Sequence, residues 1–131
     1  MSKTSTPTQL IEEYTEWIKK ESTTDRCGEW CEVTLPLLDS SSDEISFYVK
    51  TGNNTISFTD DGFTVESFAM NGIDFTPARQ QELTHIIHRF GAQLDDHNNI
   101  ILDSTGDTVD ALNRYVQALL ESHAFLSLMR A

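Results

Sequence analysis

Two adjacent aspartates and a glycine end an apolar, β-branched run in TISFTDDGFTV, residues 55–65. Paired carboxylates could hold a metal ion or transfer protons to a substrate, and Glu66 could supply a third carboxylate. Adjacent side chains in a strand point to opposite faces, however, so neighbouring aspartates seldom bind one ion together. The sequence therefore favours a structural interpretation, in which Asp60 and Asp61 form a turn and cap the next helix while Gly62 supplies a positive φ.

Two other groups of side chains have the composition of a metal site but not its spacing. The acids of DSSSDE, residues 39–44, together with Lys50 suggest a metal-dependent nuclease, but Tyr48 stands where that pattern requires a carboxylate. His85 and His88 are about one helical turn apart and could share a metal ion. They flank the apolar face of their predicted helix, however, which favours exposed positions.

The remaining reactive residue types form no recognisable motif. Cys27 and Cys31 lack the two further nearby ligands that zinc requires, and the four histidines are scattered along the chain. No Ser, Thr or Cys stands in a nucleophile motif, and the sequence contains no glycine-rich phosphate loop. We therefore expect no catalytic residue, no bound metal and no cofactor.

The charge of the chain is its strongest compositional signal. Among 131 residues, 21 Asp and Glu oppose 9 Lys and Arg, which gives a formal net charge of −12. Such a surface repels the phosphates of nucleic acids and the headgroups of anionic lipids, so we expect neither direct nucleic-acid binding nor membrane binding. The same field attracts basic proteins, although acidity also serves solubility alone. No apolar run approaches the roughly 20 residues of a membrane span, and the N-terminus lacks a signal-peptide core, which predicts a cytoplasmic protein.

Hydrophobic periodicity and turn signals predict a single α+β domain over residues 1–131, in which residues 1–6 are disordered. The predicted order is α-β-β-β-α-α-β-β-α, and ESTTDRCG, residues 21–28, is expected to be a loop. The helices and strands are expected at residues 7–20 (helix), 29–35, 44–50 and 55–59 (strands), 63–71 and 77–90 (helices), within 92–104 (a hairpin with its turn at 96–99) and 105–128 (helix).

These elements predict one antiparallel sheet with the helices packed on one face. The buried face is expected to carry Ile45, Phe47, Val49, Ile56 and Phe58. On the opposite face, Trp30, Glu32 and Tyr48 could form an aromatic and acidic patch, and aromatic residues are frequent in interface hot spots. The predicted partner-binding residues are Trp30, Glu32, Tyr48, Asp60, Asp61 and Glu66.

The order of three segments resembles a small family of bacterial and phage proteins, the domain of unknown function 1828. The segments are LIEEYTEWIKKES, GEWCEVTLPLLDSSSDEISFYVK and ISFTDDGFTVESFAMNGID, and the resemblance runs from Leu10 to Phe90. Its most specific element is the strand that ends in T-D-D-G, followed by an aromatic residue, Phe63, and a short helix with Gly72. The resemblance implies no activity, but it implies a setting in phages and mobile elements.

We therefore expect a non-enzymatic protein of phage or mobile-element type that binds a protein partner. In this hypothesis it mimics the charge of DNA and inhibits a nucleic-acid-binding protein of a host defence system, as anti-CRISPR and anti-restriction proteins do. Two alternatives remain open from the sequence. One is a small metal-dependent hydrolase or nuclease that uses Asp60 and Asp61, and the other is a structural homodimer.

Overall fold

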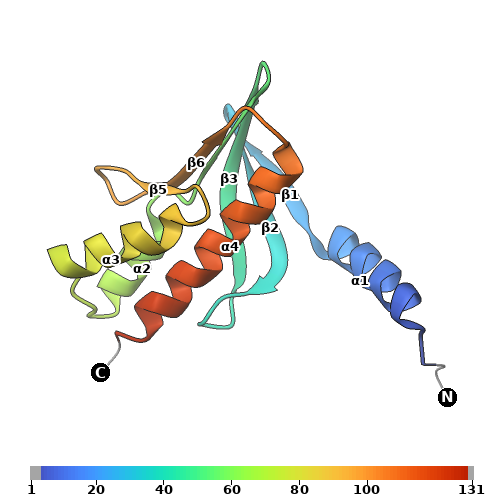
Figure 1. Cartoon of the computed structure of the whole chain (residues 1–131), viewed down its shortest axis with the longest axis horizontal. Helices are drawn as coiled ribbons and strands as arrows, with labels where there is room; N and C mark the ends of the chain where they lie inside the picture. Colours follow the sequence, from blue (N-terminus) through green and yellow to red (C-terminus); the bar gives the residue numbers. More distant parts are fainter. Residues whose placement is uncertain (1–3, 130–131) are drawn as a thin grey trace.

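The computed structural model describes residues 4–129, which form four helices and one six-stranded antiparallel sheet (Figure 1). The strands lie in the order β1-β2-β3-β4-β6-β5. The predicted α+β class and its order of elements are confirmed, with one further strand before the others. The elements are α1 (Pro7–Glu21), β1 (Thr23–Cys27), β2 (Trp30–Leu38), β3 (Glu44–Gly52), β4 (Thr55–Thr59), α2 (Phe63–Met70), α3 (Pro77–His88), β5 (Gln93–Leu94), β6 (Ile100–Ser104) and α4 (Thr108–Ser127).

The core lies between one face of the sheet and the helices α2, α3 and α4, with α4 running across the sheet in Figure 1. Ile45, Phe47, Ile56 and Phe58 are buried there, and Val49 packs against the same core, as the alternation predicted. Tyr115 of α4 contacts the rings of Phe47 and Phe58 at centroid distances of 5.4 and 5.1 Å. Its hydroxyl donates a 2.6 Å hydrogen bond to the carbonyl of Ile100, so the buried phenol is satisfied.

The strand β1 replaces part of the predicted loop at residues 21–28, so that prediction is wrong over Thr23–Cys27. The strand pairs antiparallel with β2 from Thr23 to Cys27, and Gly28 has a φ of 64° in the turn between them. Every residue of β1 is exposed. An exposed polar strand has no alternation of apolar and polar residues, so hydrophobic periodicity cannot predict its pairing with β2.

The strand β2 also continues beyond residue 35, where it was predicted to end, and it includes Pro36. The register between β2 and β3 shifts between Leu35 and Leu38. Because proline cannot donate a ladder hydrogen bond, such an irregularity is where a strand tolerates it. The strand therefore reaches the loop that contains Asp39.

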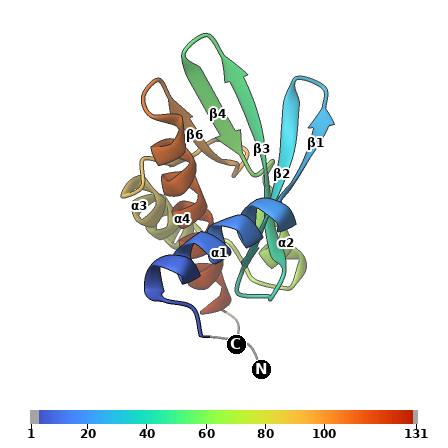
Figure 2. The same cartoon turned by 90° about the vertical axis from the view of Figure 1, so that its right-hand side faces the viewer.

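The helix α1 departs furthest from the expected packing. Thr6 and Gln9 form a capping box at its start, and Pro7 stands in its first turn. No residue of α1 is buried, however, and the helix projects from the β1 side of the sheet, away from α2, α3 and α4 (Figures 1 and 2). The prediction that the helices pack on the core face therefore holds for α2, α3 and α4 and is wrong for α1.

The start of the chain was predicted to be disordered over residues 1–6, of which residues 1–3 lie outside the described part. Within the rest, the hydroxyl of Ser5 donates to the carboxylate of Glu13 at 2.9 Å, and Thr6 caps α1. No helix among the described residues is long and apolar enough to cross a membrane.

Candidate functional site

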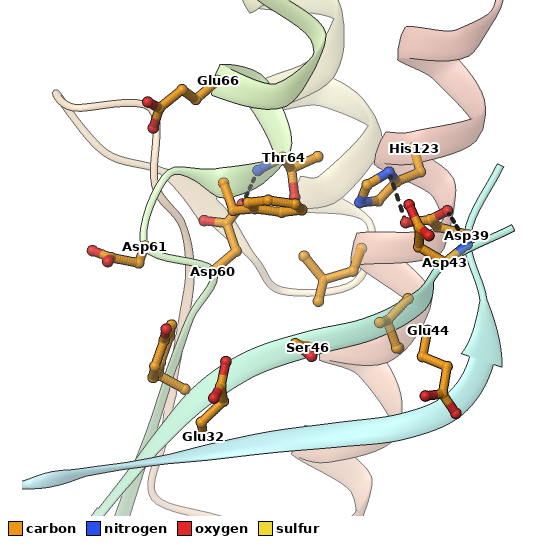
Figure 3. A pocket seen from close by; sticks show the side chains of 14 residues that line it. Glu32, Asp39, Asp43, Glu44, Ser46, Asp60, Asp61, Thr64, Glu66 and His123 are labelled. Atoms are coloured by element: carbon orange, nitrogen blue, oxygen red, sulfur yellow. Dashed lines mark hydrogen bonds and ion pairs between the residues drawn. The ribbon is translucent and has the colours of Figure 1, made fainter. Parts of the chain in front are cut away.

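A cavity of about 460 Å³ opens where β4 ends and the chain turns into α2. It is bounded by the first half of β3, the turn between β4 and α2, the loop between β2 and β3, and the second half of α4 (Figure 3). Seven carboxylate residues line it, whereas no Lys or Arg lies among its described lining residues. The seven are Glu32, Asp39, Asp43, Glu44, Asp60, Asp61 and Glu66.

Asp60 is a buried structural residue with 2% of its surface exposed. One carboxylate oxygen accepts hydrogen bonds from the backbone N–H groups of Gly62, at 3.0 Å, and Ile100, at 2.9 Å. The other oxygen accepts from the N–H of Thr64 at 3.1 Å. Since Gly62 stands at the N-cap of α2 and has no side chain, the carboxylate of Asp60 caps the helix in its place, through the N–H of Thr64, the second helical residue. The turn-and-cap interpretation is confirmed for this residue.

Asp61 has a different role, because its side chain is exposed and points away from that of Asp60 (Figure 3). Its φ of 56° and the φ of 74° at Gly62 make the sharp turn, and its own N–H donates to the hydroxyl of Thr59 at 3.1 Å. Aspartate tolerates this left-handed conformation better than most residues. A metal-dependent hydrolase built on these two residues requires their carboxylates to converge on one point. The two carboxylates do not converge. Within residues 4–129, no group of three or more His, Cys, Asp and Glu side chains is placed to hold a metal ion.

The inner end of the cavity is formed by two residues that the sequence analysis did not predict as a site, Asp39 and His123. Asp39 accepts hydrogen bonds from the N–H groups of Ser41, at 2.8 Å, and Asp43, at 3.1 Å, which fold the loop after β2. Its side chain is only 6% exposed. Figure 3 shows Asp39 and Asp43 beside His123 at one end of the cavity, with Asp61 and Glu66 at the other.

His123 brings α4 into this site and is itself 6% exposed. Its Nδ1 lies 3.7 Å from Oδ2 of Asp39, which is too long for a hydrogen bond. This nitrogen is the buried side-chain polar atom that has no hydrogen-bond partner among the described residues. Burial lowers the pKa of His123 below its ordinary 6.5, and the carboxylates of Asp39, Asp60 and Asp43 oppose that shift. The imidazole is therefore neutral at pH 7.

The predicted aromatic and acidic residues fall into two adjoining hollows. Tyr48 faces Glu32 across the β2–β3 pair, and both line the acidic cavity. Burial first, and the Glu32 carboxylate second, raise the pKa of the Tyr48 phenol. Trp30 instead lines a smaller hollow of about 320 Å³, which shares Tyr48 and Asp61 with the cavity. The ammonium of Lys50 lies 5.7 Å from the centroid of the Trp30 ring, so this aromatic face already holds a cation.

The structure thus brings five of the six predicted residues to one cavity and places Trp30 beside it. A signal for Asp39 was present in the sequence, because aspartate followed by serines commonly forms a side-chain-to-backbone turn. His123 stood on the apolar face of a predicted helix, where a histidine is more often a core residue than a site residue. Nothing in the sequence places these two residues side by side.

The model of the family described as Domain of unknown function DUF1828 matches residues 35–121. The match begins within β2 and ends within α4, so it contains the turn with Asp60 and leaves out α1 and β1. Comparison with curated proteins and with solved structures gives no match. Because the matched segment spans most of the chain, the protein belongs to the DUF1828 family.

Proposed function

We propose that this protein is a non-enzymatic binding protein whose acidic cavity captures a basic segment of a protein partner. The observation that carries the proposal is the lining of the cavity, with its seven carboxylates and no Lys or Arg among the described residues. Carboxylates gathered in a concave site add their potentials, which attracts Lys and Arg side chains and excludes anions. The net charge of −12 extends the same field over the whole molecule.

The hydrogen bonds of the Asp60 carboxylate support a binding function rather than a catalytic one. Both oxygens of its carboxylate are occupied by backbone N–H groups, so this group is engaged in holding the turn and not free to accept a proton from a substrate. Asp61 is exposed, and its side chain points away from that of Asp60. The carboxylates that remain accessible can pair with cationic groups without any reaction.

A nucleic-acid-binding protein is the partner class that this charge fits best. Such a protein places Lys and Arg side chains where phosphates bind, and carboxylates can occupy those side chains in place of phosphates. The resemblance to phage and mobile-element proteins supplies the setting. In that setting the partner is a protein of a host defence system, such as a CRISPR or restriction protein, and the inhibitor acts in the cytoplasm as a mimic of DNA charge.

The test is a pull-down from nuclease-treated bacterial lysate, with mass spectrometry of the proteins retained at low and at high salt. We expect one basic nucleic-acid-binding protein to be retained at about 50 mM salt and lost at about 500 mM, because salt screens exposed charge pairs. Retention that is equal at both salt concentrations would contradict charge mimicry.

Two matched triple variants separate the cavity from the overall charge. One carries Asp43→Asn, Asp61→Asn and Glu66→Gln, all exposed residues at the cavity. The other carries Glu12→Gln, Asp74→Asn and Glu82→Gln, all exposed residues outside it. Each variant removes three negative charges, so only a cavity-specific effect distinguishes them. We expect the first variant to lose the partner and the second to retain it.

A homodimer is the second candidate, and the surface of α1 favours it. Leu10, Ile11, Tyr14 and Trp17 are 57, 63, 48 and 47% exposed and lie at helical spacing on one face of α1. Two copies of such a face can pack against each other about a two-fold axis. Sedimentation equilibrium of the wild type and of a Leu10→Ser, Trp17→Ser variant tests this candidate, which predicts a dimer that the substitutions convert to a monomer.

A further inference from the structure

The first residues of β3 have a neighbouring strand on only one side. β2 pairs with β3 as far as Glu44, whereas β4 pairs only with residues 48–52 of β3, because the chain leaves the sheet at Asp60. In the part of the chain that the structure describes, no strand pairs with the other side of residues 44–47. Alternate residues of a strand direct their N–H and C=O groups to opposite sides. Some of these peptide groups therefore face the empty side.

The acidic cavity lies on this unpaired edge. Glu44, Ile45 and Ser46 line it from β3, and Leu119 and His123 line it from α4. Figure 3 shows β3 passing along the cavity with Ser46 on it. Its volume of about 460 Å³ is within the range of about 300–1,000 Å³ that is usual for ligand sites. The cavity thus offers backbone donors and acceptors as well as carboxylates.

The unsatisfied nitrogen of His123 is a second and independent sign of a ligand. A buried polar atom without a partner is uncommon in native proteins. Nδ1 of His123 is such an atom, and it faces a carboxylate of Asp39 that is too distant to bond with it. A ligand N–H group near this pair could donate to Asp39 while the neutral imidazole accepts a second hydrogen bond.

We propose, on the basis of the function proposed above, that the cavity receives an extended basic segment of the partner. The segment adds a short strand to the edge of β3 at residues 44–47, and one of its Arg side chains reaches Asp39 and His123. Strand addition gives affinity through main-chain hydrogen bonds, and pockets for alternate side chains give specificity. Arginine fits because its planar guanidinium presents five donors and stays charged.

The same observations distinguish this ligand from a small cation. A metal ion or a free polyamine would use the carboxylates but would leave the unpaired peptide groups of β3 without partners. An extended peptide satisfies both, because its backbone pairs with the edge while its side chains alternate between the cavity and the solvent.

The test uses synthetic peptides of alternating valine and arginine with blocked ends, titrated into the full-length protein by calorimetry. Two further peptides carry N-methyl groups on alternate backbone nitrogens, one peptide for each edge of the strand, and a fourth has citrulline in place of arginine. We expect one N-methylated peptide to bind at least about tenfold more weakly, while the other retains its affinity, because only one edge of the peptide pairs with β3. The citrulline peptide should also bind at least about tenfold more weakly.

The site is located by hydrogen exchange of the backbone N–H groups of residues 44–47, followed by NMR with and without the arginine peptide. We expect slower exchange of alternate N–H groups there, and weaker binding to the cavity triple variant than to its matched control. Equal affinity for both N-methylated peptides would overturn strand addition but leave charge-based partner capture intact. If no peptide binds, the inference is wrong, and the pull-down alone then decides the proposed function.

Discussion

The carboxylate of Asp60 links three segments by hydrogen bonds. These are the turn that follows β4, the start of α2 and the start of β6. We expect Asp60→Ala to lower the free energy of unfolding by about 3–5 kcal/mol, because it leaves buried N–H groups without a partner. The measurement is urea denaturation of both proteins. Asp61→Asn is the control, since an exposed asparagine tolerates the same φ, and it should change stability by less than about 0.5 kcal/mol. Equal losses in the two variants would show that Asp60 does not hold the turn.

His123 predicts a pH dependence of stability whose sign follows from its environment. Asp39, Asp43 and Asp60 face it from the loop and the turn, but burial dominates and lowers its pKa below 6.5. The unfolded chain therefore binds a proton at a pH where the folded protein does not. The stabilisation is present above the ordinary pKa of 6.5 and is lost as the pH falls through the lower pKa of the folded state.

We expect the free energy of unfolding to decrease more between pH 7.5 and 5 in the wild type than in His123→Gln, which cannot titrate. Urea denaturation at several pH values measures this difference. The carboxylates titrate in both proteins, so their contribution is removed from the comparison. Parallel pH profiles would mean that the imidazole is as free to charge in the folded protein as in the unfolded chain.

At the scale of elements, α1 contributes little to the folded core. Leu10 and Ile11 are mostly exposed, whereas Leu83 of α3 is fully buried. We expect the double substitution Leu10→Ala, Ile11→Ala to change the free energy of unfolding of the monomer by less than about 1 kcal/mol. Leu83→Ala should lower it by about 2–5 kcal/mol, because it leaves a cavity in the core. Denaturation at low protein concentration checks this, and a large loss from the α1 substitutions would show that the helix packs on the body in solution.

The elements also show which parts of the fold could be predicted from the sequence. The hairpin of β3 and β4 was predictable because alternation of Ile45, Phe47, Ile56 and Phe58 records which side of a strand is buried. A stripe of apolar residues on α1 likewise predicts a helix with an apolar face, but it does not say what covers that face. The exposed strand β1 has no alternation of apolar and polar residues in the sequence from which it could be predicted. Asp39 and His123 meet only because β2 and α4 pack at the same end of the molecule, and such long-range proximity is not encoded in local spacing.

At the scale of the whole molecule, the charge of −12 acts on stability as well as on binding. Mutual repulsion of carboxylates favours the expanded chain, and salt screens it, so added sodium chloride should raise the midpoint of thermal unfolding. The cavity concentrates part of this charge in one place. A polycation that binds there in the folded state alone raises the free energy of unfolding, by an amount that grows with the logarithm of its concentration relative to its dissociation constant.

Spermidine therefore distinguishes general charge screening from cation binding in the cavity. The comparison is between thermal unfolding of the wild type and that of the two triple variants. Sodium chloride should stabilise both variants equally, because each has lost three negative charges. Spermidine at millimolar concentration should raise the unfolding midpoint of the wild type and of the variant substituted at Glu12, Asp74 and Glu82. It should have a smaller effect on the variant substituted at Asp43, Asp61 and Glu66, because the cavity of that variant attracts cations less strongly. If spermidine acts equally on both variants, the acidity is spread over the surface as a solubility device and the cavity is not a preferred site for cations.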